Sequence, residues 1–287
     1  MRVAMSYPTV SIIIPCYNDG KYLPEAVAAA RAQTYPNIEI IIVNDYSTDS
    51  LTNLLLEKFA SEGITVIKTE AGRKGLSAAR NTAIKAANGT YILPLDADDK
   101  VDPTYVEKAV AVLEHKPDVL ICTARVRFFG LRHNEWIQNP YSYANLVLEE
   151  HKILATSLFR RKDWVRIGGY EESLTLGKED MVFWLDMLKD GGEVEVLPQI
   201  LIYYRIKPYS MSALRAGAPT ECEKVTAMYA SRPDIFHAHL IDFMCYGANF
   251  RLEESQRVCL FSWKLLSPVL KLEWTLRQKV KRLFGRA

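Results

Sequence analysis

Short apolar runs alternate with amphipathic stretches along the first third of the chain. Four runs, each bounded by polar or turn-forming residues, predict buried strands, and they span residues 10–15, 38–43, 65–68 and 91–95. The stretches between them have apolar residues at helical spacing, and they span residues 22–32, 52–60 and 76–87. Strands that alternate with helices form crossover units, so the pattern predicts a doubly wound, mostly parallel α/β sheet with helices on both faces.

The second half of the chain continues this pattern and then changes. Further elements are expected at 119–127 (strand), 157–170 (strand and turn), 178–189 (helix) and 193–206 (strand). The last part of the chain has helical periodicity, in stretches at 221–230, 234–249 and 252–284. We therefore expect an α/β domain over residues 1–215 and a helical C-terminal extension over residues 216–287.

Polar and acidic residues directly follow three of the predicted strands, at residues 15–18, 44–49 and 96–99. Ligands of doubly wound sheets bind outside the carboxyl ends of the strands, so these segments are expected to meet at one site. The third segment, Asp96-Ala97-Asp98-Asp99, places three carboxylates within four residues, and these repel one another unless a cation neutralises them. Hard divalent cations prefer such oxygen ligands. A solvated acidic turn, or the N-cap of a helix beginning near Pro103, explains the same residues without a ligand.

The composition is that of an ordinary globular protein, since 49% of the 287 residues are hydrophobic and 24% are charged. The net charge of +2 excludes a strongly basic nucleic-acid binder. The five cysteines are scattered, which favours a reducing compartment over a disulfide framework. The sequence has neither the pattern of a secretory signal peptide nor the ~20 apolar residues of a membrane-spanning helix. We therefore expect a cytoplasmic protein.

The C-terminal stretch has a chemistry of its own. Apolar residues recur every three or four positions from Val269 to Leu283, and Lys and Arg greatly outnumber acidic residues after Ser262. A basic amphipathic helix of this kind lies on a membrane surface, here the inner face of the plasma membrane. Packing against the α/β domain, or in a homodimer, explains the same stripe equally well.

Four motifs occur in order in the first domain, namely PCYN, VNDYSTDS, GLSAARN and YILPLDADD. Together they resemble the family 2 glycosyltransferases, whose nucleotide-sugar-binding α/β fold is called GT-A. The resemblance covers residues 10–102 and resumes at 168–180 and 204–212. It implies an enzyme that transfers a sugar from a nucleotide-sugar donor to a hydroxyl group, with inversion at the anomeric carbon and with a divalent cation, Mn²⁺ or Mg²⁺.

The resemblance also implies which residues hold the donor. Nucleotide-sugar contacts are implied for Pro15, Tyr17, Asn18, Asp45, Arg80, Asn81 and Asp96. Asp45 would accept a hydrogen bond from the base, and because a carboxylate suits the imide N–H of uracil, the expected donor is a UDP-sugar. Asp96 would contact the ribose, and Asp98 would bind the metal that bridges the two phosphates.

The acceptor side is implied by the segment Lys178-Glu179-Asp180. Asp180 would be the general base that takes the proton of the acceptor hydroxyl, with Glu179 as its neighbour and the second choice. Without the resemblance, the acidic pair is explained by its favourable place at a helix N-terminus. Arg205 and Ser210 resemble a segment that closes over the diphosphate, where Arg205 supplies a cationic fork. The implied acceptor is a glycan or a lipid-linked molecule of envelope polysaccharide or glycoconjugate synthesis.

Other functions remain as alternatives. A sugar-nucleotidyltransferase would have a glycine-rich basic loop after the first strand, and PCYNDGKY does not supply one. A Rossmann dehydrogenase would have GxGxxG at the same place, and this motif is missing there as well. A non-catalytic carbohydrate-binding module on the same fold would lose Asp98 or Asp180, and both are present. The donor sugar and the acceptor depend on residues 128–145 and 164–176, where the resemblance is weakest.

Overall fold

The computed structural model describes residues 7–136, 141–148, 151, 153–175, 177–207 and 221–240. The chain forms two compact units, Met1–Ala218 and Pro219–Ala287. The predicted boundary near residue 215 falls outside the described residues, so the predicted domain division stays a prediction. In the second unit the described residues form helices α8 (Glu221–Ser231) and α9 (Pro233–Ala238). The predicted membrane-surface or dimer-forming stretch at 252–284 lies outside the described residues.

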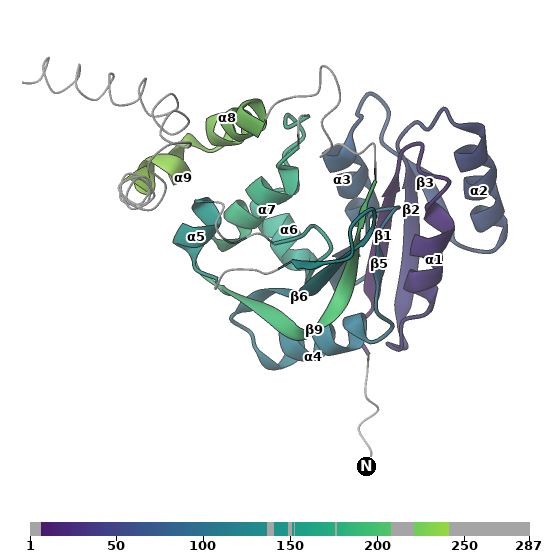
Figure 1. Cartoon of the computed structure of the whole chain (residues 1–287), viewed down its shortest axis with the longest axis horizontal. Coiled ribbons are helices and arrows are strands. Elements are labelled where there is room, and N and C mark those ends of the chain that lie inside the picture. The colour runs from purple at the N-terminus through teal and green to yellow at the C-terminus, as the bar shows by residue number, and fades with distance from the viewer. Residues whose placement is uncertain are drawn as a thin grey trace, which may run out of the picture. The chain divides into compact units, whose positions relative to one another are not determined.

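A single mixed sheet organises the first unit (Figure 1). Its strands are β1 (Val10–Cys16), β2 (Ile38–Asn44), β3 (Thr65–Lys68), β4 (Tyr91–Pro94), β5 (Lys100–Val101), β6 (Val119–Gly130), β7 (Glu135–Trp136), β8 (Leu158–Arg160) and β9 (Glu193–Ile206). Their order across the sheet is β3-β2-β1-β4-β8-β6-β9-β5, and β7 pairs with β6. The predicted strands at 65–68 and 193–206 form with the predicted bounds.

Most of the long strand pairings are parallel, as the alternation of strands and helices predicts. β1 pairs in parallel with β2 and with β4, β2 with β3, and β6 with β9. Strand β8 runs antiparallel to both β4 and β6 and thereby joins the two parallel groups, and the short strands β5 and β7 are also antiparallel to their partners. The fold class predicted from the sequence is confirmed, and the antiparallel strand in the middle is the feature that the apolar pattern did not predict.

Helices cover both faces of the sheet (Figure 1). They are α1 (Leu23–Arg31), α2 (Ser50–Ser61), α3 (Leu76–Ala86), α4 (Tyr105–His115), α5 (Tyr143–Val147), α6 (Arg161–Ile167) and α7 (Glu179–Leu188). Alternate side chains of β1 point to opposite faces. Ile12 and Ile14 therefore pack in the core that Leu23 of α1 and Phe59 of α2 complete, whereas Ile13 is buried on the face that α3 covers.

Helix α6 corrects the expectation of a strand and turn over residues 157–170. Only Leu158–Arg160 is a strand, and Arg161–Ile167 is helical. The helix ends at Gly168, which takes a left-handed conformation (φ 83°) that glycine adopts without strain. The first glycine of the pair is thus a helix C-cap.

Among the described helices none has both the length and the apolar character that crossing a membrane requires.

Candidate active site

The order of the strands reverses between β1 and β4. From β1 the chain proceeds to β2 and β3 on one side, and it then returns to β4 on the other side of β1. Such a reversal of strand order opens a crevice at the carboxyl edge, where ligands of α/β sheets bind. The PCYN motif follows β1, the VNDYSTDS motif follows β2, and the acidic motif follows β4, so all three predicted segments reach this edge.

Asn18 fastens the loop after β1 to the loop after β2. Its side-chain oxygen accepts hydrogen bonds from the backbone N–H groups of Thr48 (2.8 Å) and Asp49 (2.9 Å), and its amide nitrogen donates to the Thr48 hydroxyl (3.2 Å). Its own backbone N–H donates to the Ser47 hydroxyl (3.1 Å). Pro15 is buried within β1, one residue before the strand ends. Asn18 therefore holds the two loops together, and its predicted place at the nucleoside pocket stays a prediction.

Asp45 directly follows β2 and is buried at the same edge of the sheet. One carboxylate oxygen accepts a hydrogen bond from the Thr69 hydroxyl (2.8 Å), and the other accepts one from the backbone N–H of Gly75 (2.9 Å). Each carboxylate oxygen can accept a further bond, so the group keeps the capacity to accept a donor from a base. Tyr17 is exposed to 47%, and the Lys74 ammonium lies 5.2 Å from the centre of its ring. An exposed aromatic face thus stands at the predicted nucleoside pocket.

Backbone strain is concentrated at this edge. Among the described residues, three that are not glycine have a positive φ, namely Asn18 (55°), Tyr46 (60°) and Lys178 (69°). Asn18 is itself a predicted site residue, Tyr46 follows Asp45, and Lys178 precedes Glu179. Such conformations cost on the order of 1 kcal/mol or more and persist where the surrounding structure holds them, most often at functional sites.

Each carboxylate of the acidic motif has a different protein partner. Asp96 pairs with the Arg80 guanidinium at 2.9 Å, and Asp98 pairs with the Lys207 ammonium at 2.7 Å. Asp99 is fully buried and accepts the backbone N–H of Arg205 at 2.8 Å. Burial raises the pKa of Asp98 and of Asp99, and the neighbouring carboxylates raise them further. The motif therefore needs positive charge to remain ionised.

Arg80 connects the acidic motif with the start of α7. Its side chain is 1% exposed, and its two terminal nitrogens lie 2.9 Å from Asp96 and 2.9 Å from Glu179. Despite burial, these carboxylates raise the pKa of the guanidinium, so it stays charged. The Tyr170 ring lies 5.4 Å from its central carbon. The contacts of Arg80 are thus with protein carboxylates, and its predicted contact with the donor stays a prediction.

Asp180 differs from Glu179 in what its carboxylate binds. Glu179 is buried and committed to Arg80 at 2.9 Å, whereas Asp180 accepts a hydrogen bond from the neighbouring backbone N–H of Met181. Burial raises the pKa of Asp180 to about 7, and the charge of Glu179 adds to this effect. A carboxylate with a pKa near neutrality can take and release a proton at the pH of the cell. Asp180 therefore has the properties of a general base.

Arg205 and Lys207, at the end of β9, flank the acidic motif. The Arg205 guanidinium lies between two aromatic rings, 4.7 Å from the centre of Tyr22 and 4.2 Å from that of Phe129. It also donates to the backbone oxygen of Asp98 at 2.8 Å. In these contacts it fixes the acidic loop, and its predicted role at the diphosphate stays a prediction. Ser210 lies outside the described residues.

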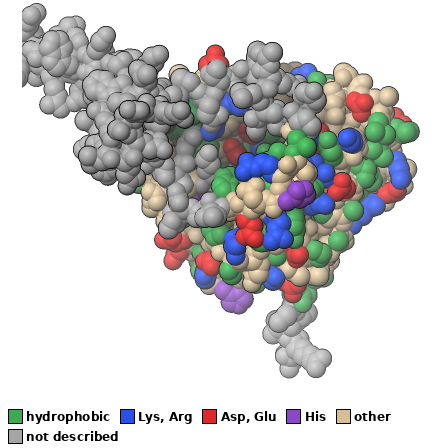
Figure 2. Space-filling view, viewed as in Figure 1, with side chains coloured by type: hydrophobic (Ala, Val, Ile, Leu, Met, Phe, Trp, Pro, Cys, Tyr) green, Lys and Arg blue, Asp and Glu red, His purple; other side chains and the backbone are tan. Residues whose placement is uncertain are grey.

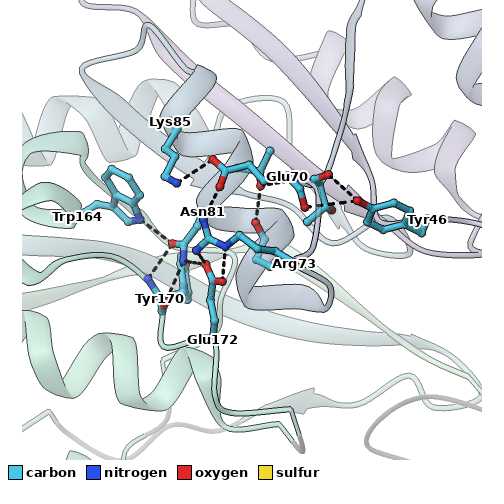
Figure 3. Close-up of polar contacts among 11 residues, drawn as sticks. Tyr46, Glu70, Arg73, Asn81, Lys85, Trp164, Tyr170 and Glu172 are labelled. Atoms are coloured by element: carbon cyan, nitrogen blue, oxygen red, sulfur yellow. Dashed lines mark hydrogen bonds and ion pairs between the residues drawn. The ribbon is translucent and has the colours of Figure 1, made fainter.

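Asn81 is hydrogen-bonded on all sides by protein groups (Figure 3). Its amide nitrogen donates to the backbone oxygen of Tyr170 (2.9 Å) and to Glu172 (2.7 Å). Its amide oxygen accepts from the indole N–H of Trp164 (3.1 Å) and from the backbone N–H of Tyr170 (2.9 Å). An amide can make four such bonds, so the side chain connects α3 to the segment after the glycine pair. Its predicted contact with the donor stays a prediction.

The acidic motif fits a divalent cation that is held jointly with phosphates. Among the described residues no group of three or more His, Cys, Asp or Glu side chains could bind a metal by itself. Mg²⁺ and Mn²⁺ at nucleotide sites are typically bound by one or two carboxylates together with phosphate oxygens and water. Asp98 fits that mode, since its carboxylate already pairs with one cation, the Lys207 ammonium, at 2.7 Å.

Charges of both signs are intermixed over the described part of the face seen in Figure 2. Nucleic-acid-binding surfaces instead gather Lys and Arg into a patch or stripe of one sign.

Comparison with known proteins agrees with this geometry. Residues 11–176, more than half of the chain, match glycosyl transferase family 2. The chain is 30% identical over 224 residues to the Escherichia coli UDP-Glc:alpha-D-GlcNAc-diphosphoundecaprenol beta-1,3-glucosyltransferase WfaP, a match that covers 71% of this chain and 80% of WfaP. It is 34% identical over 113 residues to the glycosyltransferase GlyA of Streptococcus pneumoniae serotype 4, covering 39% of this chain and 16% of GlyA.

A solved structure has the same fold. The mannosyltransferase PcManGT from Pyrobaculum calidifontis, in complex with GDP-Man and Mn²⁺, superposes with a TM-score of 0.60 at 19% identity, covering 99% of this chain and 89% of that one. The sheet and its carboxyl-edge crevice therefore define a GT-A glycosyltransferase fold. The chain belongs to glycosyl transferase family 2. The chain spans 36% of the length of the putative glycosyltransferase EpsH of Bacillus subtilis and 16% of the length of GlyA.

Several residues of the site have no signal in the sequence. Lys207 bridges Asp19 (2.8 Å) and Asp98 (2.7 Å). Glu172 lies within the resembling stretch 168–180 but was not a predicted site residue, and it binds both Arg73 and Asn81. Arg73 and Glu172 are 99 residues apart in the chain, and Asp98 and Lys207 are further apart still. Residue type and local spacing alone do not predict them.

Proposed function

We propose that the chain is an inverting glycosyltransferase that moves a sugar from a nucleotide-sugar donor, a UDP-sugar, to a hydroxyl group of a glycan or lipid-linked acceptor. The observation that carries the proposal is the arrangement around Arg80. This buried cation lies 2.9 Å from Asp96 of the acidic motif and 2.9 Å from Glu179, which stands next to Asp180. One side chain thus joins the acidic motif, proposed to bind the donor, to the residue that precedes Asp180, the proposed general base.

Asp180 is the proposed general base. In transfer with inversion, the acceptor hydroxyl attacks the anomeric carbon from the side opposite the leaving nucleotide, and a carboxylate takes the hydroxyl proton during the attack. Burial holds the pKa of Asp180 at about 7, which suits both accepting that proton and releasing it afterwards. Glu179 is the second choice for the base, because its carboxylate is already paired with Arg80.

The nucleoside is proposed to lie over the loops after β1 and β2. Tyr17 offers an exposed ring on which a base can stack, and Asp45 below it can accept an N–H bond of the base. A buried carboxylate acceptor favours the imide N–H of uracil over adenine, which has no such donor. The relative WfaP uses UDP-Glc by its name, and this supports a UDP-sugar as the donor.

The diphosphate is proposed to lie at the acidic motif, where Asp98 holds a divalent cation. When bound, this cation stabilises the negative charge that develops on the leaving nucleotide. The Mn²⁺ bound with GDP-Man in the structure of PcManGT supports the assignment of Mn²⁺ or Mg²⁺. In the chain itself, Arg205 fixes the acidic loop by binding the Asp98 backbone oxygen, and the Lys207 ammonium lies close enough to share a phosphate.

The acceptor is proposed to be a saccharide, either free or carried on a lipid diphosphate. The name of WfaP describes a diphosphoundecaprenol-linked acceptor. The basic C-terminal stretch would bring the enzyme to the cytoplasmic face of a membrane carrying such a lipid, or would form a homodimer. We place the protein in the cytoplasm, as a peripheral protein of that membrane.

A donor panel with Mn²⁺ tests the proposal. Unfolding temperature is measured with UDP-, GDP-, dTDP- and CMP-sugars, and nucleotide release is then followed with the donor that stabilises most. A ligand at 100 times its dissociation constant stabilises the folded state by about 2.7 kcal/mol, so a true donor gives a clear rise. Stabilisation by UDP-sugars alone, with release that EDTA stops, is the expected result. Binding without any turnover of donor would instead support a non-catalytic carbohydrate-binding module.

A further inference from the structure

The loop between β3 and α3 touches the proposed nucleoside pocket at successive residues. The backbone N–H of Gly75 donates to the Asp45 carboxylate at 2.9 Å, and the Lys74 ammonium lies 5.2 Å from the centre of the Tyr17 ring. Asp45 and Tyr17 are the two side chains proposed to hold the base. Their geometry therefore depends on how firmly this loop is held.

Arg73, the residue before Lys74, holds the loop in place (Figure 3). Its Nε donates to the Glu172 carboxylate at 2.6 Å, and one terminal nitrogen donates to the second oxygen of the same carboxylate. The other terminal nitrogen pairs with Glu70 at 2.5 Å. A guanidinium bound at both oxygens of one carboxylate is fixed in direction as well as in place.

Glu172 belongs to the other side of the site. It follows the glycine pair and Tyr170, in the segment that leads to α7 and Asp180. Its carboxylate also accepts the amide of Asn81 at 2.7 Å, and Asn81 is in turn bound to Tyr170 and Trp164. A single carboxylate thus connects the loop at the nucleoside pocket with the segment next to the proposed base.

We propose that Glu172 is a positioning residue that sets nucleotide affinity by holding the Arg73 loop against the segment after the glycine pair. The inference rests on the proposed function, since it presumes that Asp45 and Tyr17 bind the base. Glu172 itself touches neither residue, and it acts through Arg73, Lys74 and Gly75.

We expect the loss of the Glu172 charge to leave the fold in place. The Glu172 and Arg73 side chains are 24% and 33% exposed, and partly exposed ion pairs contribute little to the stability of a whole domain. Glu172→Gln keeps the shape and removes the charge. The adjacent Glu171 offers a matched control, because its carboxylate accepts hydrogen bonds from the backbone and side chain of Ser173 rather than from the loop.

The test measures binding and loop protection in the wild type, Glu172→Gln, Glu171→Gln, Arg73→Gln and the double variant Arg73→Gln/Glu172→Gln. The probe is whichever of UDP, GDP and dTDP binds the wild type most tightly with Mn²⁺ by calorimetry. We expect Glu172→Gln to weaken binding roughly fivefold to tenfold, as loss of charge-assisted hydrogen bonds does, with Glu171→Gln unchanged. Arg73→Gln should have a similar effect, and the double variant should be no worse than either single one.

Hydrogen exchange separates the clamp from the nucleotide. Without ligand, amides of the 70–75 loop should exchange faster in Glu172→Gln than in Glu171→Gln, while those of β1 and β2 stay unchanged. In turnover, the donor KM should rise with kcat nearly constant. Equal affinity in Glu172→Gln and the wild type overturns the inference, as does additivity of the two single changes. A wild type that binds none of the three nucleotides overturns the proposed function, and the inference fails with it.

Discussion

Asp180→Asn separates the chemistry of the site from its stability. The change removes the carboxylate proposed to take the acceptor proton and leaves a side chain of nearly the same shape. Transfer should fall by about 10²–10⁴-fold, the usual contribution of a general base, while affinity for the donor nucleotide stays close to that of the wild type. The reason is that the proposed donor contacts are made by other residues, on the loops after β1, β2 and β4.

The raised pKa of Asp180 fixes the pH dependence of both quantities. The active form is the carboxylate, so at pH 6 roughly a tenth of the molecules would be active if the pKa is about 7. Turnover should rise with pH, reach half of its maximum near pH 7 and level off above about pH 8. In the folded state the proton is held up to about pH 7, whereas an unperturbed Asp loses it near 3.8. The native state therefore binds more protons in this window, and the stability of the wild type falls as pH rises through it.

The size of the effect follows from the same difference. The pKa of Asp180 is raised by about three units in the folded state, and each unit corresponds to 1.36 kcal/mol. The upper limit for the cost of ionising Asp180 above pH 7 is therefore about 4 kcal/mol. Asp180→Asn has no charge at that position, so it should unfold at a higher temperature than the wild type at pH 8 and at nearly the same temperature at pH 4. Thermal unfolding across pH, together with turnover and calorimetric affinity for UDP, measures these outcomes.

Glu179→Gln is the matched comparison, with the opposite expected sign. Its carboxylate pairs with buried Arg80 at 2.9 Å, and removal of one partner of a buried ion pair costs about 3–5 kcal/mol. The Gln variant should therefore be less stable than the wild type at pH 8. Near-normal turnover in Asp180→Asn, with loss of turnover in Glu179→Gln, would show that we assigned the base to the wrong carboxylate. If both variants stay active, the acidic pair only begins a helix.

Three further predictions concern the donor site and the fold. Asp98→Asn should abolish transfer and weaken Mn²⁺-dependent nucleotide binding in calorimetry, and full activity of this variant or of the wild type in EDTA would refute the proposed metal. Asp45→Asn should reduce the preference for UDP over other nucleoside diphosphates while the unfolding temperature changes little, and unchanged UDP affinity would show that Asp45 does not bind the base. Gly169→Ala should destabilise the protein by about 1–3 kcal/mol in urea unfolding, because an added Cβ would lie 2.8 Å from the Asn81 amide oxygen and 3.0 Å from the Trp164 indole nitrogen; Gly168→Ala, whose Cβ meets nothing within 4 Å, should cost less.

The sequence predicts the framework of the fold because strand burial leaves a local pattern. Val10–Cys16 and Ile38–Asn44 are mostly apolar, with three consecutive isoleucines in each, as is typical of strands covered on both faces. Helix α6 was not predicted, since Arg161–Ile167 has no clear apolar stripe and buries Asp163 in place of an apolar side chain. The antiparallel strand β8 was not predicted either, because strand direction depends on neighbours that are distant in sequence.

The candidate site shows the same division between residue types and partners. The motifs indicate that Asp96, Asp98 and Asp180 carry the chemistry, and the structure brings their segments to one edge. The motifs do not indicate that Arg80 is buried between two carboxylates, or that Asp98 pairs with Lys207. Burial of a charge is decided by packing across the whole domain, so the partner that neutralises it cannot be predicted from local spacing.

The tie between Asp99 and β9 has a consequence for how the protein is made. Asp99 is buried in the finished domain, and its hydrogen-bond donor, the backbone N–H of Arg205, follows 106 residues later in the chain. At a ribosomal speed of about 5–20 residues per second, that donor emerges roughly 5–20 s after the carboxylate. Burying a carboxylate that has no hydrogen-bond partner costs free energy. We therefore expect the acidic loop to stay exposed to water during this interval. The catalytic edge is then completed only when β9 pairs with β6, near the end of synthesis of the first unit.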